Sequence, residues 1–373
     1  MLLCVPAVTV SAEEIIEKDA SLYTELEPEL KEVDKILAEM FEDGISFQEL
    51  VRALMTGKLE QVLASEGESV LELLLSLAAD TFQKSKGAML SLLLLGILSA
   101  VFSNISEAFE TKGSAQVSFY IVSLLLASIL LRAMREVSAL GSEVLVNIVQ
   151  FMQVLIPTFI AATAFSAGAS GAAVFYASSM LAIWLVEVLL KQVLLPFAEF
   201  YIILNFVNHL LQEDLLTQLM ELIKSVILFL LKAVLGVIIG IQTIQSLLAP
   251  MLHSLKASAV HKAIAAIPGI GGGLNVVTQT IVSSALVVKN SVGVAGMLVL
   301  ILIAIAPVIE LLVIVMLYKI TAAMLGVISE KRLSMCVYNM GEGIKLIMKT
   351  VVTAMVLFMI SIALIASFTN RGV

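Results

Sequence analysis

From about Lys86 to its C-terminus the sequence is a succession of long apolar segments that few charged residues interrupt. The hydrocarbon core of a bilayer is about 30 Å thick, and an apolar α-helix crosses it in about 20 residues. Lipid offers no partner to backbone N–H and C=O groups, so a spanning segment must be a helix or part of a closed barrel. The segments lack the two-residue alternation of a barrel strand, so an all-α, polytopic membrane protein is predicted.

The amino-acid composition also predicts a membrane protein. Of the 373 residues 60% are hydrophobic and 14% are charged, and the mean hydropathy is +1.05. A soluble chain of this length cannot bury that much apolar side chain in its own core. About seven spans are predicted, at residues 88–103, 115–131, 148–167, 172–190, 222–244, 292–318 and 346–367. The short segment 196–207 is interpreted as the second half of a broken helix, and 263–288 as a re-entrant pair or an eighth span.

Charge divides the chain into a membrane part and an acidic part. Residues 13–86 carry 18 acidic and 7 basic side chains, which is a net charge of −11 in a chain whose total is −8. An acidic extracytoplasmic region is therefore predicted at 13–86 and a polytopic membrane domain at 87–373. With an external N-terminus, Arg132 and Arg135 after the second span also lie outside, whereas Lys331 and Arg332 look cytoplasmic, so loop orientation stays open.

The first twelve residues resemble the end of a secretory signal peptide. They are apolar, finish on the small residues Ser11 and Ala12, and are followed directly by two glutamates. A basic n-region is missing, so a truncated signal is favoured over a segment that is not a signal. Cys4 would be removed with it, which leaves Cys336 without a partner for an internal disulfide.

Two capping boxes mark helix starts within the acidic region. Ser46-Phe-Gln-Glu49 and Ser69-Val-Leu-Glu72 both have the spacing that satisfies the first free N–H groups of a helix. Apolar residues at helical spacing follow each box. A small amphipathic helical subdomain is predicted, lying against the membrane or a partner, with a solvated acidic spacer as the alternative.

The membrane domain shows signs of an internal duplication. Pro157 and Pro268 are 111 positions apart, and so are Pro196-Phe-Ala-Glu199 and Pro307-Val-Ile-Glu310. The repeat units would cover about 143–250 and 254–361. Small residues follow the first proline of each unit and are typical of the broken helices of transporters. The predicted helix breaks are Gly168, Gly171, Pro268, Gly271 and Gly272.

Ionisable residues inside spans are expensive in lipid and are therefore functional candidates. Glu199, Glu310 and Lys232 have no local partner, so they are expected to line a polar path or contact another subunit, or else to pair within the bundle. Glu187 and Lys191 have the spacing of a helical ion pair. Four amides are expected to join helices. They are Asn205, Asn208, Gln242 and Gln245.

Catalytic and ligand motifs give little support to an enzyme. His253 and His261 are eight positions apart with no carboxylate near them, which does not fit a metal site. The glycines of 268–273 lack the Lys-Ser/Thr of a phosphate loop. No hydrolase signature and no basic, aromatic surface for nucleic acid is present. We therefore expect no enzymatic activity, no cofactor, no metal and no nucleic acid partner.

Several motifs in a fixed order resemble the stage III sporulation protein AE family. They are Gly44-Ile-Ser-Phe-Gln-Glu-Leu-Val51 with Thr56-Gly57, Gln242-Thr-Ile-Gln245 with Ala249-Pro250, Leu286-Val-Val-Lys289-Asn290-Ser-Val-Gly293, and Tyr318-Lys-Ile-Thr-Ala-Ala323 with Glu330-Lys-Arg332. The resemblance covers most of the chain from about residue 40. It implies a multi-pass protein of the mother-cell membrane surrounding the forespore. The family has no established catalytic residues, so none can be assigned to this chain from the resemblance.

The same resemblance implies a function. Family members are expected to be membrane subunits of the channel, or feeding tube, that joins mother cell and forespore and is needed for late forespore gene expression. The implied partners are other membrane proteins of that stage III complex, the lipid bilayer and a separate ATPase. Broken helices and midplane carboxylates leave a stand-alone secondary transporter as the alternative. A purely structural scaffold is a third reading, and an intramembrane enzyme a distant fourth.

Overall fold

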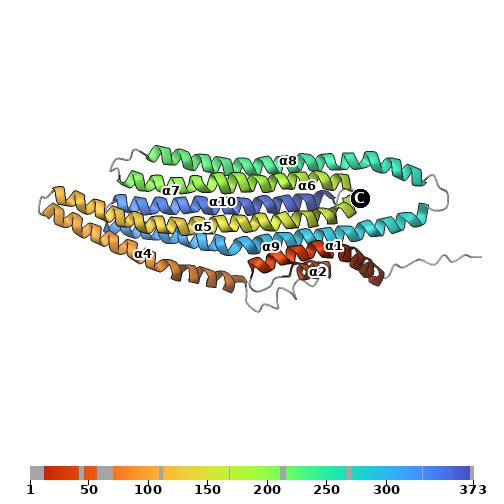
Figure 1. Ribbon diagram of the computed structural model, residues 1–373, viewed down its shortest axis with the longest axis horizontal. Coiled ribbons are helices and arrows are strands. Elements are labelled where there is room, and N and C mark those ends of the chain that lie inside the picture. The colour runs from red at the N-terminus through yellow and green to blue at the C-terminus, as the bar shows by residue number, and fades with distance from the viewer. Residues whose placement is uncertain are drawn as a thin grey trace, which may run out of the picture.

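The structure is a computed structural model that describes residues 12–41, 46–56, 70–108, 112–167, 169–210, 216–265, 271–329 and 331–369. Every regular element in these residues is a helix, which confirms the all-α prediction. In chain order they are α1 (Ala12–Met40), α2 (Phe47–Thr56), α4 (Val70–Ala108), α5 (Lys112–Ala167), α6 (Ala169–Leu185), the π-helix η1 (Val186–Leu194), α7 (Leu195–Leu210), α8 (Thr217–Ala265), α9 (Gly271–Ile328) and α10 (Lys331–Thr369). Figure 1 shows an elongated bundle with the long helices running along one axis.

The longest helices far exceed the thickness of a membrane. α5 has 56 residues and α9 has 58. At a rise of 1.5 Å per residue each is about 85 Å long, whereas a hydrocarbon core is about 30 Å thick. Both helices therefore extend well beyond a single hydrocarbon layer.

Six stretches of the described residues are long and apolar enough to cross a membrane. They are Leu74–Phe102, Tyr120–Ala164, Phe175–Leu210, Thr217–Gln245, Ala285–Ile328 and Lys331–Ser367. The expected count was about seven because residues 115–131 and 148–167 looked like two spans, yet both belong to α5. Arg132 and Arg135 therefore lie within a helix and not in a loop. The residues between the two apolar parts are mostly good helix formers, so nothing stops the helix there.

Residues 271–288 form the start of α9 and no separate span. They were expected in a re-entrant pair or an eighth span. The glycines at the beginning of this segment are followed by a long apolar run of helix-compatible residues. That run continues directly into the stretch Ala285–Ile328.

The helix from α6 to α7 changes its winding midway. Within η1 the turns widen, so that Leu195 N–H donates to Leu190 O five residues back. Pro196 follows at once, and a proline ring inside a helix collides with the carbonyl four residues earlier. A wider π turn relieves that collision. Residues 196–207 are thus the second half of an interrupted helix, as predicted.

Glu187 and Lys191 both lie in η1. None of the ion pairs among the described residues joins these two side chains. The predicted helical ion pair is therefore wrong.

The acidic region is helical, as predicted, but it packs on the bundle. α1 and α2 lie along α5 and α9 (Figure 1). Leu30, Val33 and Leu37 of α1 are buried. Phe47 of α2 meets Phe151 of α5 edge to face, with ring centroids 6.4 Å apart. One face of this pair is therefore covered by the chain's own bundle, and contact of the other face with a partner stays a prediction.

The first predicted capping box opens α2. Glu49 N–H donates to Ser46 Oγ at 3.3 Å. Asp34 of α1 completes the cap, because its carboxylate accepts from the backbone N–H groups of Phe47 and Gln48 and from Ser46 Oγ. Burial raises the pKa of the Asp34 carboxyl in spite of these hydrogen bonds. One side chain thus joins the two N-terminal helices.

α4 runs without interruption across residue 86 into the bundle. The second predicted capping box begins at Ser69, which lies outside the described residues. α4 and α5 form a hairpin that extends beyond the other helices at the left of Figure 1. Its outer surface exposes large apolar side chains such as Leu94, Ile97 and Leu124. Such a surface suits contact with lipid.

Three of the four amides predicted to join helices do so, whereas Gln245 Oε1 is buried without a hydrogen-bond partner among the described residues. Asn205 Nδ2 of α7 donates to the carbonyl oxygen of Cys336 on α10 at 2.8 Å. Gln242 Nε2 of α8 donates to Ser361 Oγ of α10 at 2.7 Å. Asn208 Oδ1 accepts from Leu216 N–H at the start of α8. Interhelical hydrogen bonds of this kind hold membrane helices together.

Candidate functional site

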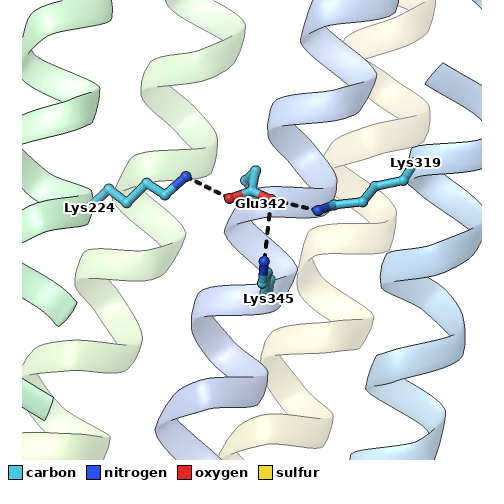
Figure 2. Close-up of polar contacts among 4 residues, drawn as sticks. All are labelled: Lys224, Lys319, Glu342 and Lys345. Atoms are coloured by element: carbon cyan, nitrogen blue, oxygen red, sulfur yellow. Dashed lines mark hydrogen bonds and ion pairs between the residues drawn. The ribbon is translucent and has the colours of Figure 1, made fainter. Parts of the chain in front are cut away.

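Lysines from three helices converge on one carboxylate. Glu342 of α10 lies 2.5 Å from Lys224 Nζ of α8 and 2.7 Å from Lys319 Nζ of α9. Lys345, one turn further along α10, is 3.9 Å away. Figure 2 shows Lys224 and Lys319 approaching Glu342 from opposite sides. We call these four residues the lysine cluster.

Two glycines allow neighbouring helices to approach Glu342. A Cβ on Gly343 would lie 2.3 Å from Ile202 Cγ1 of α7, so only glycine fits without movement there. A Cβ on Gly341 would meet Tyr318 Cβ of α9 at 3.4 Å, which is ordinary contact. The sequence Gly341-Glu342-Gly343 therefore lets α7 pack closely beside the carboxylate.

The burial of the cluster is uneven. The Glu342 side chain is 9% exposed, whereas those of Lys224, Lys319 and Lys345 are 35%, 27% and 38% exposed. Lys319 Nζ also lies 5.3 Å from the centre of the Tyr338 ring, a cation–π distance. A covered carboxylate thus holds lysines that reach the surface, with one negative charge against three positive ones.

Glu310 lies in a cavity between α4, α5 and α9. The cavity has a volume of about 200 Å³. Lys84 of α4, Glu136 of α5 and Tyr318 of α9 also line it. The predicted placement of Glu310 in a polar cavity is therefore compatible with this geometry, and its role in a path stays a prediction.

Glu199 lies on the other side of α5. Ser138 Oγ of α5 donates a hydrogen bond to its carboxylate. Glu136 lines the Glu310 cavity and Ser138, two positions further on, binds Glu199, so α5 connects the two surroundings. Gly343, which packs against Tyr201 and Ile202 of α7, connects them to the lysine cluster.

These contacts define a polar belt that crosses six helices. We define the belt as the lysine cluster together with four residues that these contacts connect to it. They are Lys84, Glu136, Glu199 and Glu310. Glu136 also forms an ion pair with Arg132 on the outer surface, with side chains 67% and 84% exposed. Polar groups of the belt therefore occur both inside the bundle and on its surface.

The other predicted site residues are dispersed. Lys232 is exposed on α8. Gly171 lies within α6, while Gly271 and Gly272 open α9. Gly168 and Pro268 lie outside the described residues, between α5 and α6 and between α8 and α9. The proposed repeat and its breaks thus stay predictions.

The lysine cluster is not predictable from charges taken one span at a time. Partners one turn away lie on the same helix, whereas Lys224, Lys319 and Glu342 are far apart in sequence. A signal was present in Gly341-Glu342-Gly343, because an acidic residue between two glycines in a spanning helix is costly unless other helices approach it.

Two further polar groups are buried in the bundle. Lys289 Nζ of α9 donates to the carbonyl oxygen of Ala366 on α10 at 3.0 Å. His209 Nε2 of α7 lies 3.3 Å from Ser123 Oγ of α5. Among the described residues no group of three His, Cys, Asp or Glu has an arrangement that could hold a metal ion. Cys336 is a buried free thiol.

Comparison with known proteins gives a consistent result. A family model described as stage III sporulation protein AE matches residues 45–369. A protein of Bacillus subtilis (strain 168) called "Stage III sporulation protein AE" is 25% identical over 282 residues, which are 75% of this chain and 70% of the relative. No solved structure matches the chain.

Proposed function

The chain belongs to the stage III sporulation protein AE family, and from this membership we propose that it is a non-enzymatic membrane subunit of the channel joining mother cell and forespore. It would lie in the mother-cell membrane that surrounds the forespore and support late forespore gene expression. The observation that carries this proposal is the family match over residues 45–369. The six long apolar stretches support the multi-pass placement.

Partner binding is the proposed mechanism. α1 buries one face on α5 and α9 and leaves a charged face outside, where Lys31, Glu32, Lys35 and Glu39 are exposed. An exposed charged face on a docked helix can be recognised by complementary charges of another subunit. We therefore assign the α1 and α2 pair to contact with other subunits of the complex.

Purification from sporulating cells tests this proposal. A tagged chain is crosslinked, purified under native conditions, and its co-purifying proteins are identified. We expect a large complex with other sporulation membrane proteins. The double variant Glu32→Lys/Glu39→Lys should lose partners, whereas Glu143→Lys, an exposed position on α5, should retain them. A lone, stable protein in the wild type would contradict the proposal.

Glu199 and Glu310 are proposed to line a polar path. The double variant Glu199→Gln/Glu310→Gln keeps the shape of both side chains and removes their charge. We expect fewer heat-resistant spores from it than from the control Glu187→Gln, which lies in η1 outside the belt. Equal spore counts from both variants would end the polar-path idea while leaving the assembly proposal intact.

A stand-alone secondary transporter is the second candidate. Two observations favour it, namely the interrupted helix at η1 and the cavity beside Glu310. Interrupted helices with midplane carboxylates are typical of transporters. This alternative predicts coupled uptake by vesicles that contain only the purified chain.

A further inference from the structure

The surroundings of Glu342 hold more positive charge than the carboxylate can balance. Besides the three lysines of the cluster, Lys349 follows Lys345 by one turn on α10, and Glu221 precedes Lys224 by one turn on α8. Among the described residues, four lysines thus stand against two carboxylates, Glu342 and Glu221, on these helices. Like charges held together in a bundle destabilise one another unless an anion compensates them.

The lysines are also free to donate outward. An ammonium group has three N–H donors. Lys224 and Lys319 each use one on Glu342, from below the surface, and about a third of each side chain remains exposed. Lys345 is only at the limit of an ion pair with Glu342. The cluster therefore presents several unused donors where its lysine side chains reach the surface.

We propose that this lysine cluster, extended by Lys349, binds a phosphate group. Lysine ammonium groups bind phosphate as compact charges, and a phosphate oxygen can take the donors that Glu342 leaves unused. Glu342 then fixes the lysines in place and limits their mutual repulsion in the empty site. The proposal goes beyond channel assembly, because the binding requires no other subunit.

The phosphate can belong to a lipid or to a soluble ion. Leu222 and Phe229, both exposed on α8, show that the helix that carries Lys224 also has apolar surface that could accommodate acyl chains. Basic pockets between membrane helices bind the head groups of anionic lipids in this way. Inorganic phosphate would use the same ammonium groups without the apolar contacts. The chemistry at the lysines is shared, and the two sources differ only in their apolar part.

Binding is measured on the purified full chain in neutral detergent by native mass spectrometry. The probes are short-chain phosphatidylglycerol, short-chain phosphatidylcholine and inorganic phosphate. We expect the double variant Lys345→Gln/Lys349→Gln to bind the preferred anion about 30-fold more weakly, since each lysine near a charged head group contributes appreciably. Lys191→Gln, a partly buried lysine in η1 outside the cluster, is the matched control and should bind as the wild type does.

The variant Glu342→Gln should change the affinity for the anion in the opposite direction. Removal of the carboxylate raises the local positive charge, so anion binding should become tighter while the melting temperature falls. A purely structural cluster would show the lower melting temperature without tighter binding. This variant keeps the proposal testable if the double lysine variant does not fold.

Each outcome either identifies the source of the phosphate, lipid or soluble ion, or contradicts the phosphate site. Preference for phosphatidylglycerol over both other probes supports a lipid head group, and binding of inorganic phosphate that competes with it supports a soluble anion. Equal binding of phosphatidylglycerol and phosphatidylcholine, with no binding of phosphate, would overturn the proposal. So would unchanged affinity in the double lysine variant and in Glu342→Gln.

Discussion

At the scale of single residues, Glu342 and its lysines are not equivalent. Each oxygen of the carboxylate accepts one close lysine, Lys224 at 2.5 Å and Lys319 at 2.7 Å. If one lysine is lost, the carboxylate keeps two others. If the carboxylate is lost, three cations remain without an acceptor in an apolar bundle. Removal of the single carboxylate should therefore cost more stability than removal of any one of the lysines.

This asymmetry predicts the effect of two substitutions on stability. Glu342→Met should lower the free energy of unfolding by on the order of 2 kcal/mol, less than for a fully buried pair because the lysines are partly exposed. Lys224→Met should cost clearly less. Denaturant titration in detergent micelles measures both. Equal losses would mean that the lysines are not held by Glu342.

A glycine pair supplies a second residue-scale prediction. Gly343→Ala should destabilise the bundle by about 1–3 kcal/mol, because the new Cβ has no room beside Ile202. Gly341→Ala is the matched control, since its Cβ finds ordinary contact distances and alanine favours the helix. Thermal unfolding of the two variants in the same detergent checks this. Similar melting temperatures would contradict the close approach of α7 to α10.

At the scale of elements, α2 depends on a side chain from α1. Asp34 caps α2 through three acceptor contacts, and burial raises the pKa of its carboxyl. A raised folded-state pKa means that the neutral form is favoured on folding. The protonated Asp34 carboxyl therefore contributes to stability below its unfolded-state pKa. This contribution is lost as the pH rises through the folded-state pKa.

Two variants of Asp34 should therefore differ. Asp34→Asn keeps an acceptor without a charge, so α2 should stay protected at neutral pH and lose this residue's pH dependence. Asp34→Ala removes the cap and should cost about 1 kcal/mol. Hydrogen exchange of the α2 amides reports the local opening. Equal protection in the alanine variant and the wild type would show that the cap does not hold α2.

The sequence predicted elements well where local chemistry determines them. The first capping box, the amide contacts and the interruption at Pro196 all rest on residues that act on near neighbours or on a generic helix surface. The prediction failed at Arg132 and Arg135, because charges were taken as the end of a span although helix propensity continues through them. It also missed Glu342, whose partners come from other helices and are set by packing that one span cannot reveal.

At the scale of the whole molecule, the polar belt bounds an apolar part of the hairpin formed by α4 and α5. Between the belt and the hairpin tip, residues 88–106 of α4 and 113–131 of α5 carry no charge. Each run of 19 residues is about 28 Å long, close to one hydrocarbon thickness. The exposed Arg132 and Glu136 then lie at the level of the head groups, where charged side chains are tolerated.

This placement predicts a pattern of accessibility. With both native cysteines replaced by serine, Glu136→Cys should react with a water-soluble maleimide, whereas Leu124→Cys should be shielded by lipid although it is similarly exposed on the protein. Labelling in intact membranes opened to both sides measures this. Equal labelling at the two positions would place the hairpin outside the hydrocarbon.

α9 is the one helix that touches both the N-terminal pair and the lysine cluster among the described elements. Pro307 lies on it and gives no N–H to the carbonyl of Ile303, so the helix is least stiff there. In mechanical terms α9 is a lever with its fulcrum at this proline. A tilt of about 10° would carry Lys319, twelve residues further on, sideways by about 3 Å. That shift is as large as the 2.7 Å contact between Lys319 and Glu342, so a pull on α1 and α2 at one arm would strain the lysine cluster at the other.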